Sequence, residues 1–172
     1  MASEASFEFV EQQIRKKTFG ILTTISPKGW PQTNGVLYGM ASPHSKLAFF
    51  IVTDKRYKKT GNIKGNPRVS FLIPFPHYYV RFAPASTVQF QGTAEIIPID
   101  NPQIFSIFKN GPRVLRRVVH AFDDPTVREN YCFIKITPHP RFICYGLGKS
   151  LRGLRKDHVA GRYTVSIPQE RR

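Results

Sequence analysis

The 172-residue chain has few cysteines, few acidic residues and no long apolar run, and each shortage excludes a class of protein. Cys132 and Cys144 are its only cysteines and form no C-x-x-C pair, which excludes a disulfide framework and a cysteine-rich zinc site. We expect two buried or half-buried thiols on neighbouring strands. No stretch approaches the roughly 20 apolar residues of a membrane-spanning helix, and the acidic N-terminus does not suit a signal peptide. The cytoplasm is therefore the expected compartment.

Acidic residues number 11 against 26 Lys and Arg, so the net charge is +15. A basic excess of this size indicates an anionic partner, which can be nucleic acid, an acidic membrane surface or a phosphorylated small molecule. The five histidines are widely scattered, so no metal site is expected. No Ser-His-Asp arrangement is evident either. Charge alone does not choose among the three kinds of partner.

The pattern of apolar residues predicts a mainly β chain with a few helices. Strands are predicted at residues 20–26, 32–40, 47–52, 68–73, 86–97, 131–137 and 141–145. Helices are predicted at 7–17, around 56–65, from 101 to 110 and at 113–122. Only one short helix interrupts the first five strands, which favours an antiparallel barrel or sandwich over a doubly wound sheet. With no repeat or linker, we expect a single domain over residues 1–172, with a basic C-terminal tail from about 149.

Basic residues gather between two predicted strands, in the segment KRYKKTGNIKG at residues 55–65. The segment begins just after a buried strand ends at Thr53, and the next strand starts after Pro67, so the fold must direct it toward one place. A phosphate group needs charge-assisted hydrogen bonds, preferably from one compact loop and a helix N-terminus. Composition alone favours a solvated charge run, and the arrangement between two apolar strands raises a phosphate site as the alternative.

Three segments resemble, in order, the pyridoxamine 5′-phosphate oxidase-like family. They are ILTTISPKGWPQTNGVLY, LAFFIVTDKRYKKTGNIKGNPRVSFLI and STVQFQGTAEII, and they span about residues 18–100. Residues 131–146 resemble the closing strands of the family more loosely. The resemblance implies an FMN-binding split β-barrel, antiparallel and flanked by helices, which forms a homodimer with flavin at the interface.

The resemblance also implies which positions contact the cofactor. Lys58 and Lys59 fall on the paired basic positions that clamp the phosphate, and Thr53 falls where a hydroxyl contacts the phosphate side. The other implied positions are Asn34, Gly35, Val36 and Leu37 against the flavin ring, Ser86, Thr87 and Val88 near the ring or phosphate, and Tyr145 at an aromatic position. Val36 and Leu37 suit a plain core role equally well, and Asn62 and Ile63 are expected to cap and pack the short helix.

The function implied is that of an FMN-dependent oxidoreductase with a small-molecule substrate or electron donor. No acid–base residue stands out as catalytic, which suits a class in which the cofactor carries the electrons. Authentic pyridoxamine phosphate oxidase activity is not favoured, because the only tryptophan is Trp30 and the C-terminal segment has no R-L-H. No histidine suits the haem-handling branch of the superfamily.

Two alternatives remain open. The deazaflavin F420, whose tail is a string of carboxylates, would suit the net charge of +15 on the same fold. A non-enzymatic module that binds nucleic acid or an anionic surface is the other alternative. Its footprint would be the aromatic segment 77–82 and the basic residues Arg113, Arg116, Arg117, Arg152, Arg155, Lys156 and Arg162.

Overall fold

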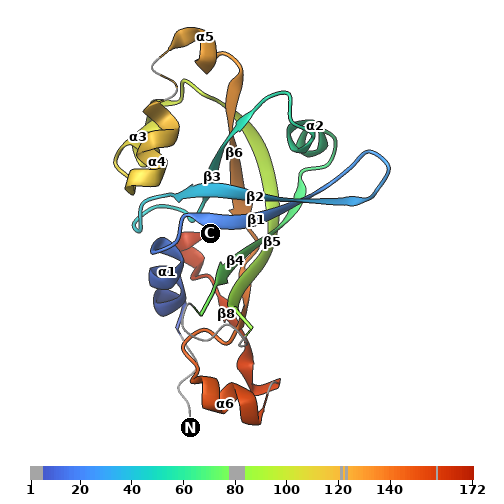
Figure 1. The fold of residues 1–172 in the computed structure, drawn as a ribbon, viewed down its shortest axis with the longest axis vertical. Helices are drawn as coiled ribbons and strands as arrows, with labels where there is room; N and C mark the ends of the chain where they lie inside the picture. The colour runs from blue at the N-terminus through green and yellow to red at the C-terminus, as the bar shows by residue number, and fades with distance from the viewer. Residues whose placement is uncertain (1–5, 78–83, 121, 123, 158) are drawn as a thin grey trace.

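Six antiparallel strands close into a barrel in the computed structural model, which describes residues 6–77, 84–120, 122, 124–157 and 159–172 (Figure 1). The barrel strands are β1 (Phe19–Ile25), β2 (Pro31–Met40), β3 (Phe49–Asp54), β4 (Arg68–Phe75), β5 (Ser86–Pro98) and β6 (Tyr131–Pro138). They pair in the order β4-β1-β2-β3-β6-β5, and pairing of β4 with β5 closes the ring. The prediction of a mainly β antiparallel split barrel is confirmed.

Two further strands extend the sheet beyond the barrel. Strand β6 pairs with residues 92–98 of β5, and β7 (Arg141–Tyr145) pairs with residues 87–89 of the same strand. Strand β8 (Arg162–Ser166) then pairs along the whole of β7. The outer face of the sheet therefore continues from the barrel onto β7 and β8.

The barrel interior is filled by aromatic side chains, because alternate residues of each strand point inward. The rings of Phe49 and Phe90 lie 4.8 Å apart between centroids, and Tyr38 meets Phe71 edge-on at 5.5 Å. Helix α1 (Phe7–Arg15), capped by the Ser6 side chain, packs against this core through residues at helical spacing. Its buried residues include Phe7, Val10 and Ile14.

A second apolar cluster covers the outside of the barrel near β2, β3 and β6. Helices α3 (Pro102–Lys109) and α4 (Arg113–His120) bury Phe108 and Leu115 in it, and the Phe108 ring stacks on Phe133 of β6 at 5.6 Å. The short helix α5 (Pro125–Arg128) leads from this cluster back into β6. The two helices predicted in the second half of the sequence therefore cover one flank of the barrel (Figure 1).

The C-terminal segment forms structure that the sequence pattern did not predict. It contains α6 (Leu151–Lys156), the 3-10 turns Val159–Gly161 and Gln169–Arg171, and strand β8 between them. Val165 and Ile167 are buried in the barrel core. Residues 149–172 are thus basic in composition, yet part of them completes the fold.

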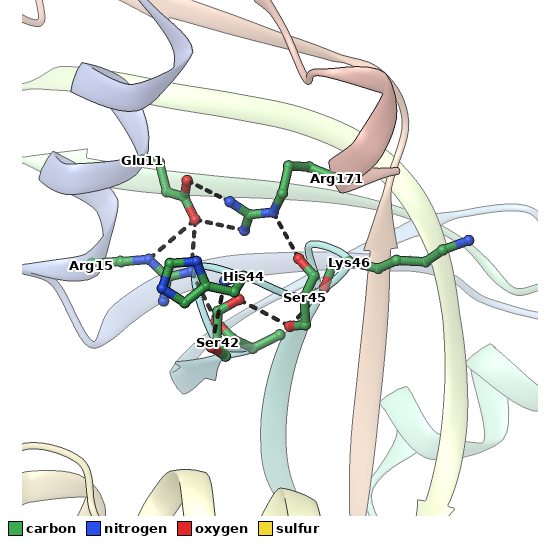
Figure 2. A network of polar contacts seen from close by, with 8 residues as sticks. Glu11, Arg15, Ser42, His44, Ser45, Lys46 and Arg171 are labelled. Atoms are coloured by element: carbon green, nitrogen blue, oxygen red, sulfur yellow. Dashed lines mark hydrogen bonds and ion pairs between the residues drawn. The ribbon is translucent and has the colours of Figure 1, made fainter.

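A buried ion-pair network ties this segment to the first helix (Figure 2). The Glu11 carboxylate, 7% exposed, accepts hydrogen bonds from Arg15 at 2.6 Å and from Arg171 at 2.9 Å. The Arg171 guanidinium also donates to the carbonyl oxygen of Ser45 in the β2–β3 loop at 2.7 Å. Three segments that are distant in the sequence therefore meet at one carboxylate.

The remaining structural expectations concern the thiols and the membrane. Cys132 lies on β6 and Cys144 on β7, and both are buried, as expected. The two strands are not neighbours, however, because β5 lies between them and pairs with each. Within the described part of the chain, no helix is long and apolar enough to cross a bilayer.

Candidate functional site

The short helix α2 (Lys58–Gly65) begins directly after β3, and a tight turn sets its direction. In that turn the Asp54 carboxylate accepts hydrogen bonds from the backbone N–H of Arg56 at 2.8 Å and from its guanidinium at 2.6 Å. These hydrogen bonds from Arg56 lower the pKa of Asp54 to about 2, so the carboxylate stays charged at neutral pH. Arg56, one of the cations of the basic segment, therefore stabilises the turn.

Helix α2 is fixed to the barrel by the side chain of Asn62, which is 5% exposed. Its amide nitrogen donates to the Thr24 hydroxyl at 3.0 Å and to the Gln32 side-chain oxygen at 2.9 Å. Ile63 beside it is buried in the barrel core. Asn62 and Ile63 thus have structural roles, as expected. The backbone carbonyl of Asn62 accepts the N–H of Asn66 at the end of the helix, and its side chain joins the helix to β1 and β2.

A hollow of about 670 Å³ lies between the start of α2 and strand β2. The hollow is lined by Gln32, Asn34, Gly35, Tyr57, Lys58 and Lys59. Two of these, Lys58 and Lys59, are the predicted lysines, and Asn34 and Gly35 are predicted residues of β2. The structure therefore brings together four of the positions that the sequence singled out. The lysines differ in environment, since Lys58 is exposed and Lys59 is half-buried.

Lys59 is positioned by the ring of Tyr57, whose centroid lies 4.4 Å from the Lys59 ammonium. Burial lowers the pKa of Lys59, because the charged ammonium loses solvation there. A partly desolvated cation gains more from an incoming anion than an exposed one does, because less water competes for it. Of the two lysines, Lys59 is therefore the one with more to gain from contact with an anion.

The N-terminus of α2 adds a second attraction for anions. No side chain of the described residues caps it, and its first turn contains no acidic residue. The first N–H groups of a helix have no partner inside the helix, and the helix dipole favours negative charge there. The uncapped N-terminus and the two lysines therefore act in the same direction.

Thr53, the last predicted contact of this region, lies on the inward face at the end of β3 and is 4% exposed. Among the described residues its hydroxyl oxygen has no hydrogen-bond partner. A buried hydroxyl without a partner is costly, and such groups often serve a ligand. Thr53 does not line the hollow, so the structure does not bring it together with the two lysines there.

The other predicted contacts lie elsewhere in the protomer. Thr87 and Tyr145 are directly paired between β5 and β7, with Ser86 and Val88 beside them, and none of these four residues lines the hollow. Ser86 is buried against Gly146, where φ is +69° and a Cβ would lie 2.8 Å from the Ser86 hydroxyl oxygen. The predicted positions therefore form two separate groups.

Val36 and Leu37 have packing roles in the structure. The Val36 side chain is buried in the barrel core, and Leu37 packs against the outer cluster under α3 and α4. Neither residue lines the hollow. This matches the core role that the sequence left open for both residues.

Two residues of the hollow, Gln32 and Tyr57, were missed by sequence reasoning. Gln32 shares a strand face with Asn34, so strand periodicity alone would have found it. Tyr57 stands between Arg56 and Lys58 in the basic segment, where an aromatic neighbour of a lysine is a signal for a cation–π contact. No group of His, Cys, Asp and Glu side chains in the described chain could hold a metal ion.

The basic residues of the nucleic-acid alternative do not form one surface. Arg113, Arg116 and Arg117 are exposed on α4, Arg152 lies on α6 and Arg162 on β8. Figure 1 shows α4 in the upper half of the molecule and α6 at the bottom. Residues 78–82 of the aromatic segment, and the side chains of Arg155 and Lys156, lie outside the described residues.

The structure is thus a closed antiparallel split barrel with a basic hollow at the N-terminus of α2. The chain belongs to the pyridoxamine 5′-phosphate oxidase family, whose sequence model matches residues 7–141. This confirms the resemblance seen in the sequence. A search of curated proteins found no match.

Solved structures with a similar fold include proteins that bind different cofactors. A pyridoxamine 5′-phosphate oxidase-related, FMN-binding protein from Nostoc punctiforme is 14% identical, with a TM-score of 0.61 over 96% of this chain and 98% of that one. An FAD-binding protein from Mesorhizobium loti is 17% identical (TM-score 0.56; 78% and 91% covered). A heme storage protein from Vibrio cholerae is 13% identical (TM-score 0.55; 78% and 92% covered). At these identities the similarity shows the fold alone.

Proposed function

We propose that the protein is a cytoplasmic, FMN-binding oxidoreductase that holds the flavin phosphate at the N-terminus of α2. The observation that carries this proposal is the hollow in which an uncapped helix N-terminus meets Lys58 and the half-buried Lys59. A phosphate monoester is a compact dianion, and it needs several charge-assisted donors within one small space. The hollow supplies two ammonium groups beside the uncapped first turn of the helix.

The residues of the hollow have distinct roles in this proposal. Lys59, held by the Tyr57 ring, neutralises the phosphate, and Lys58 adds a second charge from the solvent side. Gln32 and Asn34 offer side-chain amides to the polar chain of the cofactor, and Gly35 leaves room for the Phe19 ring beside the strand. The bound flavin would supply the ring that accepts and donates electrons, while the protein orients it and excludes water.

We assign Ser86, Thr87, Val88 and Tyr145 to the same cofactor through a homodimer. One cross-strand row on the outer face runs from Gly35 in the hollow through Ile21, Leu72 and Gln89 to Ile143, next to Tyr145. Ile21 and Leu72 are only half-buried and Ile143 is 38% exposed, so this face presents apolar area to solvent. A second copy packed on this face would cover it and would bring its own β5–β7 residues toward the hollow.

The absorption spectrum of the purified protein tests the cofactor directly. Bound or reconstituted FMN would give the two-band visible spectrum of an oxidised flavin, whereas F420 would give a single band. A protein that cannot be reconstituted with FMN, or that takes up only F420, contradicts the proposal. The substrate is proposed only as a small molecule.

Matched lysine variants test the location of the phosphate. Lys59→Ala should weaken FMN binding by roughly tenfold or more and Lys58→Ala by less, since Lys59 is the more buried cation. Lys109→Ala, at the exposed end of α3, is the control and should leave the FMN affinity unchanged. Equal FMN affinities for all three variants would contradict the hollow as the binding site of the FMN phosphate.

A further inference from the structure

Basic side chains gather on one flank of the barrel, where the end of α1 meets the turn between α3 and α4. Lys17, just after α1, lines one small pocket together with Gly111 and Pro112 of that turn. Figure 1 shows α1, α3 and α4 on the same side of the molecule. The cations at these helix ends and along the start of α4, which we call the basic patch, are Lys16, Lys17, Lys109, Arg113, Arg116 and Arg117.

The charge of the basic patch is not balanced by acidic neighbours. No Asp or Glu occurs in residues 12–53 or 101–122, and His120 at the end of α4 is the other ionisable side chain of the second stretch. All residues of the patch except the half-buried Lys17 are exposed. None of the six forms an ion pair with a carboxylate of the described residues, whereas Arg15 beside them is bound to Glu11.

Helix stability does not explain where the arginines of the patch lie. Lys16 and Lys109 are at the C-terminal ends of α1 and α3, where the helix dipole favours a cation. Arg113 and Arg116 are instead among the first four residues of α4, where the dipole disfavours positive charge. Arg113 also precedes Arg116 and Arg117 by three and four residues, and like charges at these spacings destabilise a helix. An anionic partner on this face would offset both costs.

The side chains around the patch do not suit a protein partner or a single nucleic-acid strand. The core of a protein interface needs large apolar or aromatic anchors. Among the described residues of α3 and α4, Val114 is the one large apolar side chain that is exposed, at 40%. Stacking of bases requires exposed aromatic rings, and the described residues of α1, α3 and α4 include none. The exposed ring of Phe19 lies beside Gly35 of β2.

A membrane surface with anionic lipids meets the requirements of the patch. Anionic lipids diffuse within a bilayer, so they can collect beneath a compact group of cations without matching a fixed spacing. Groups of about four to eight Lys and Arg residues are typical of proteins that bind such lipids. Each basic residue near the surface strengthens binding roughly fivefold.

We propose that the basic patch docks the protein on a membrane surface rich in anionic phospholipids. The contact is electrostatic and lies at the level of the lipid headgroups, because the apolar side of α4 is buried against the barrel through Leu115 and Val119. The patch shares no residue with the hollow at α2 or with the outer row that the proposed homodimer covers. The proposal therefore does not depend on the proposed function.

Sedimentation of the full chain with lipid vesicles tests the docking. Vesicles of phosphatidylcholine with about 30% phosphatidylglycerol provide the anionic surface, and pure phosphatidylcholine vesicles are the neutral reference. At about 0.1 M salt the protein should bind the anionic vesicles at least about a hundredfold more tightly than the neutral ones. Raising the salt to about 1 M should abolish this preference, because the Debye length falls to about 3 Å.

A triple variant of α4 tests whether the basic patch is responsible. Arg113→Gln/Arg116→Gln/Arg117→Gln should weaken binding to the anionic vesicles by roughly a hundredfold, because each of the three lost charges contributes about fivefold. Its thermal unfolding midpoint should stay the same or rise, since like charges on one helix face are removed. This second measurement shows that weaker binding does not come from a damaged fold.

A charge-matched control separates the patch from the overall positive charge of the protein. Lys28→Gln/Arg141→Gln/Arg152→Gln also removes three exposed charges, from the β1–β2 turn, β7 and α6. It should weaken binding by less than about threefold, because charges more than a Debye length from the lipid are largely screened. Equal losses in the two triple variants would overturn the proposal, because binding would then follow net charge alone.

Two further outcomes would overturn the proposal. One is equal binding of the wild-type protein to anionic and neutral vesicles. The other is tighter binding to a DNA duplex than to anionic vesicles at equal phosphate concentration, lost in the α4 variant, which would assign the patch to nucleic acid. Flavin uptake does not enter the test: a protein that takes up no FMN but docks through α4 supports the patch and contradicts only the proposed function.

Discussion

At the scale of single residues, a substitution of Thr53 should affect the stability of the fold and the binding of FMN in different directions. Its buried hydroxyl has no partner among the described residues, so replacing it by a methyl group removes a desolvated polar group without changing the shape. Thr53→Val should therefore keep or raise the free energy of unfolding by up to about 1 kcal/mol while weakening FMN binding. Urea unfolding without cofactor and FMN titration measure the two effects. A clear loss of stability with unchanged FMN affinity would show that the hydroxyl serves the fold.

Asp54 gives a prediction on pH. Hydrogen bonds from Arg56 lower its pKa in the folded protein from 3.8 to about 2. A lowered pKa stabilises the fold at pH values above 3.8, and this contribution is lost as the pH falls from 3.8 toward 2. The stability difference between wild type and Asp54→Asn should therefore shrink over that interval. Unfolding curves at several pH values measure it, and a difference that is constant with pH contradicts the role given to the turn.

At the scale of elements, the Glu11 network holds α1, the β2–β3 loop and the C-terminal segment together. Removing its carboxylate leaves Arg15 and Arg171 without their shared acidic partner in a largely buried setting. Glu11→Ala should therefore lower the free energy of unfolding by about 2–3 kcal/mol. The matched control is Glu95→Ala, because the Glu95–Lys135 pair is exposed and its loss should cost less than about 1 kcal/mol. Similar losses for both variants would mean that the network does not hold the chain ends.

Most elements were predictable from local patterns, whereas β8 was not. The inward face of β5 reads directly from the sequence, since Val88, Phe90 and Ala94 alternate with polar residues. In β8 only Val165 is buried, so its five residues carry too little periodicity to be recognised within a basic segment. The two lysines of the hollow were predictable in the same way, because they come directly after strand β3 in the sequence. Gln32 shares a strand face with Asn34 and was open to the same reasoning, but its hydrogen bond to Asn62, thirty residues away, is not contained in any local pattern.

At the scale of the whole molecule, the proposed site is shared between two copies of the chain. The protein should then have about twice the 19.7 kDa mass of one chain in solution. Mixing two impaired variants, at an FMN concentration that neither binds appreciably, tests the sharing: Lys59→Ala weakens the hollow, and Thr87→Arg blocks the β5–β7 group. Mixed dimers should regain one intact site and bind FMN at up to half the wild-type amount. No recovery, or a protein that remains monomeric with FMN bound, contradicts a shared site.

The central claim is that the start of α2 recognises a phosphate group, and comparison of FMN with riboflavin tests it most directly. Riboflavin carries the same ring and sugar chain without the phosphate. Titration of the flavin-free protein should show FMN binding at least about a hundredfold more tightly than riboflavin, because several charge-assisted hydrogen bonds are lost with the phosphate. In Lys59→Ala the preference for FMN should fall sharply while riboflavin affinity stays unchanged. Equal affinities for FMN and riboflavin in the wild type, or a preference that Lys59→Ala leaves intact, would contradict the claim.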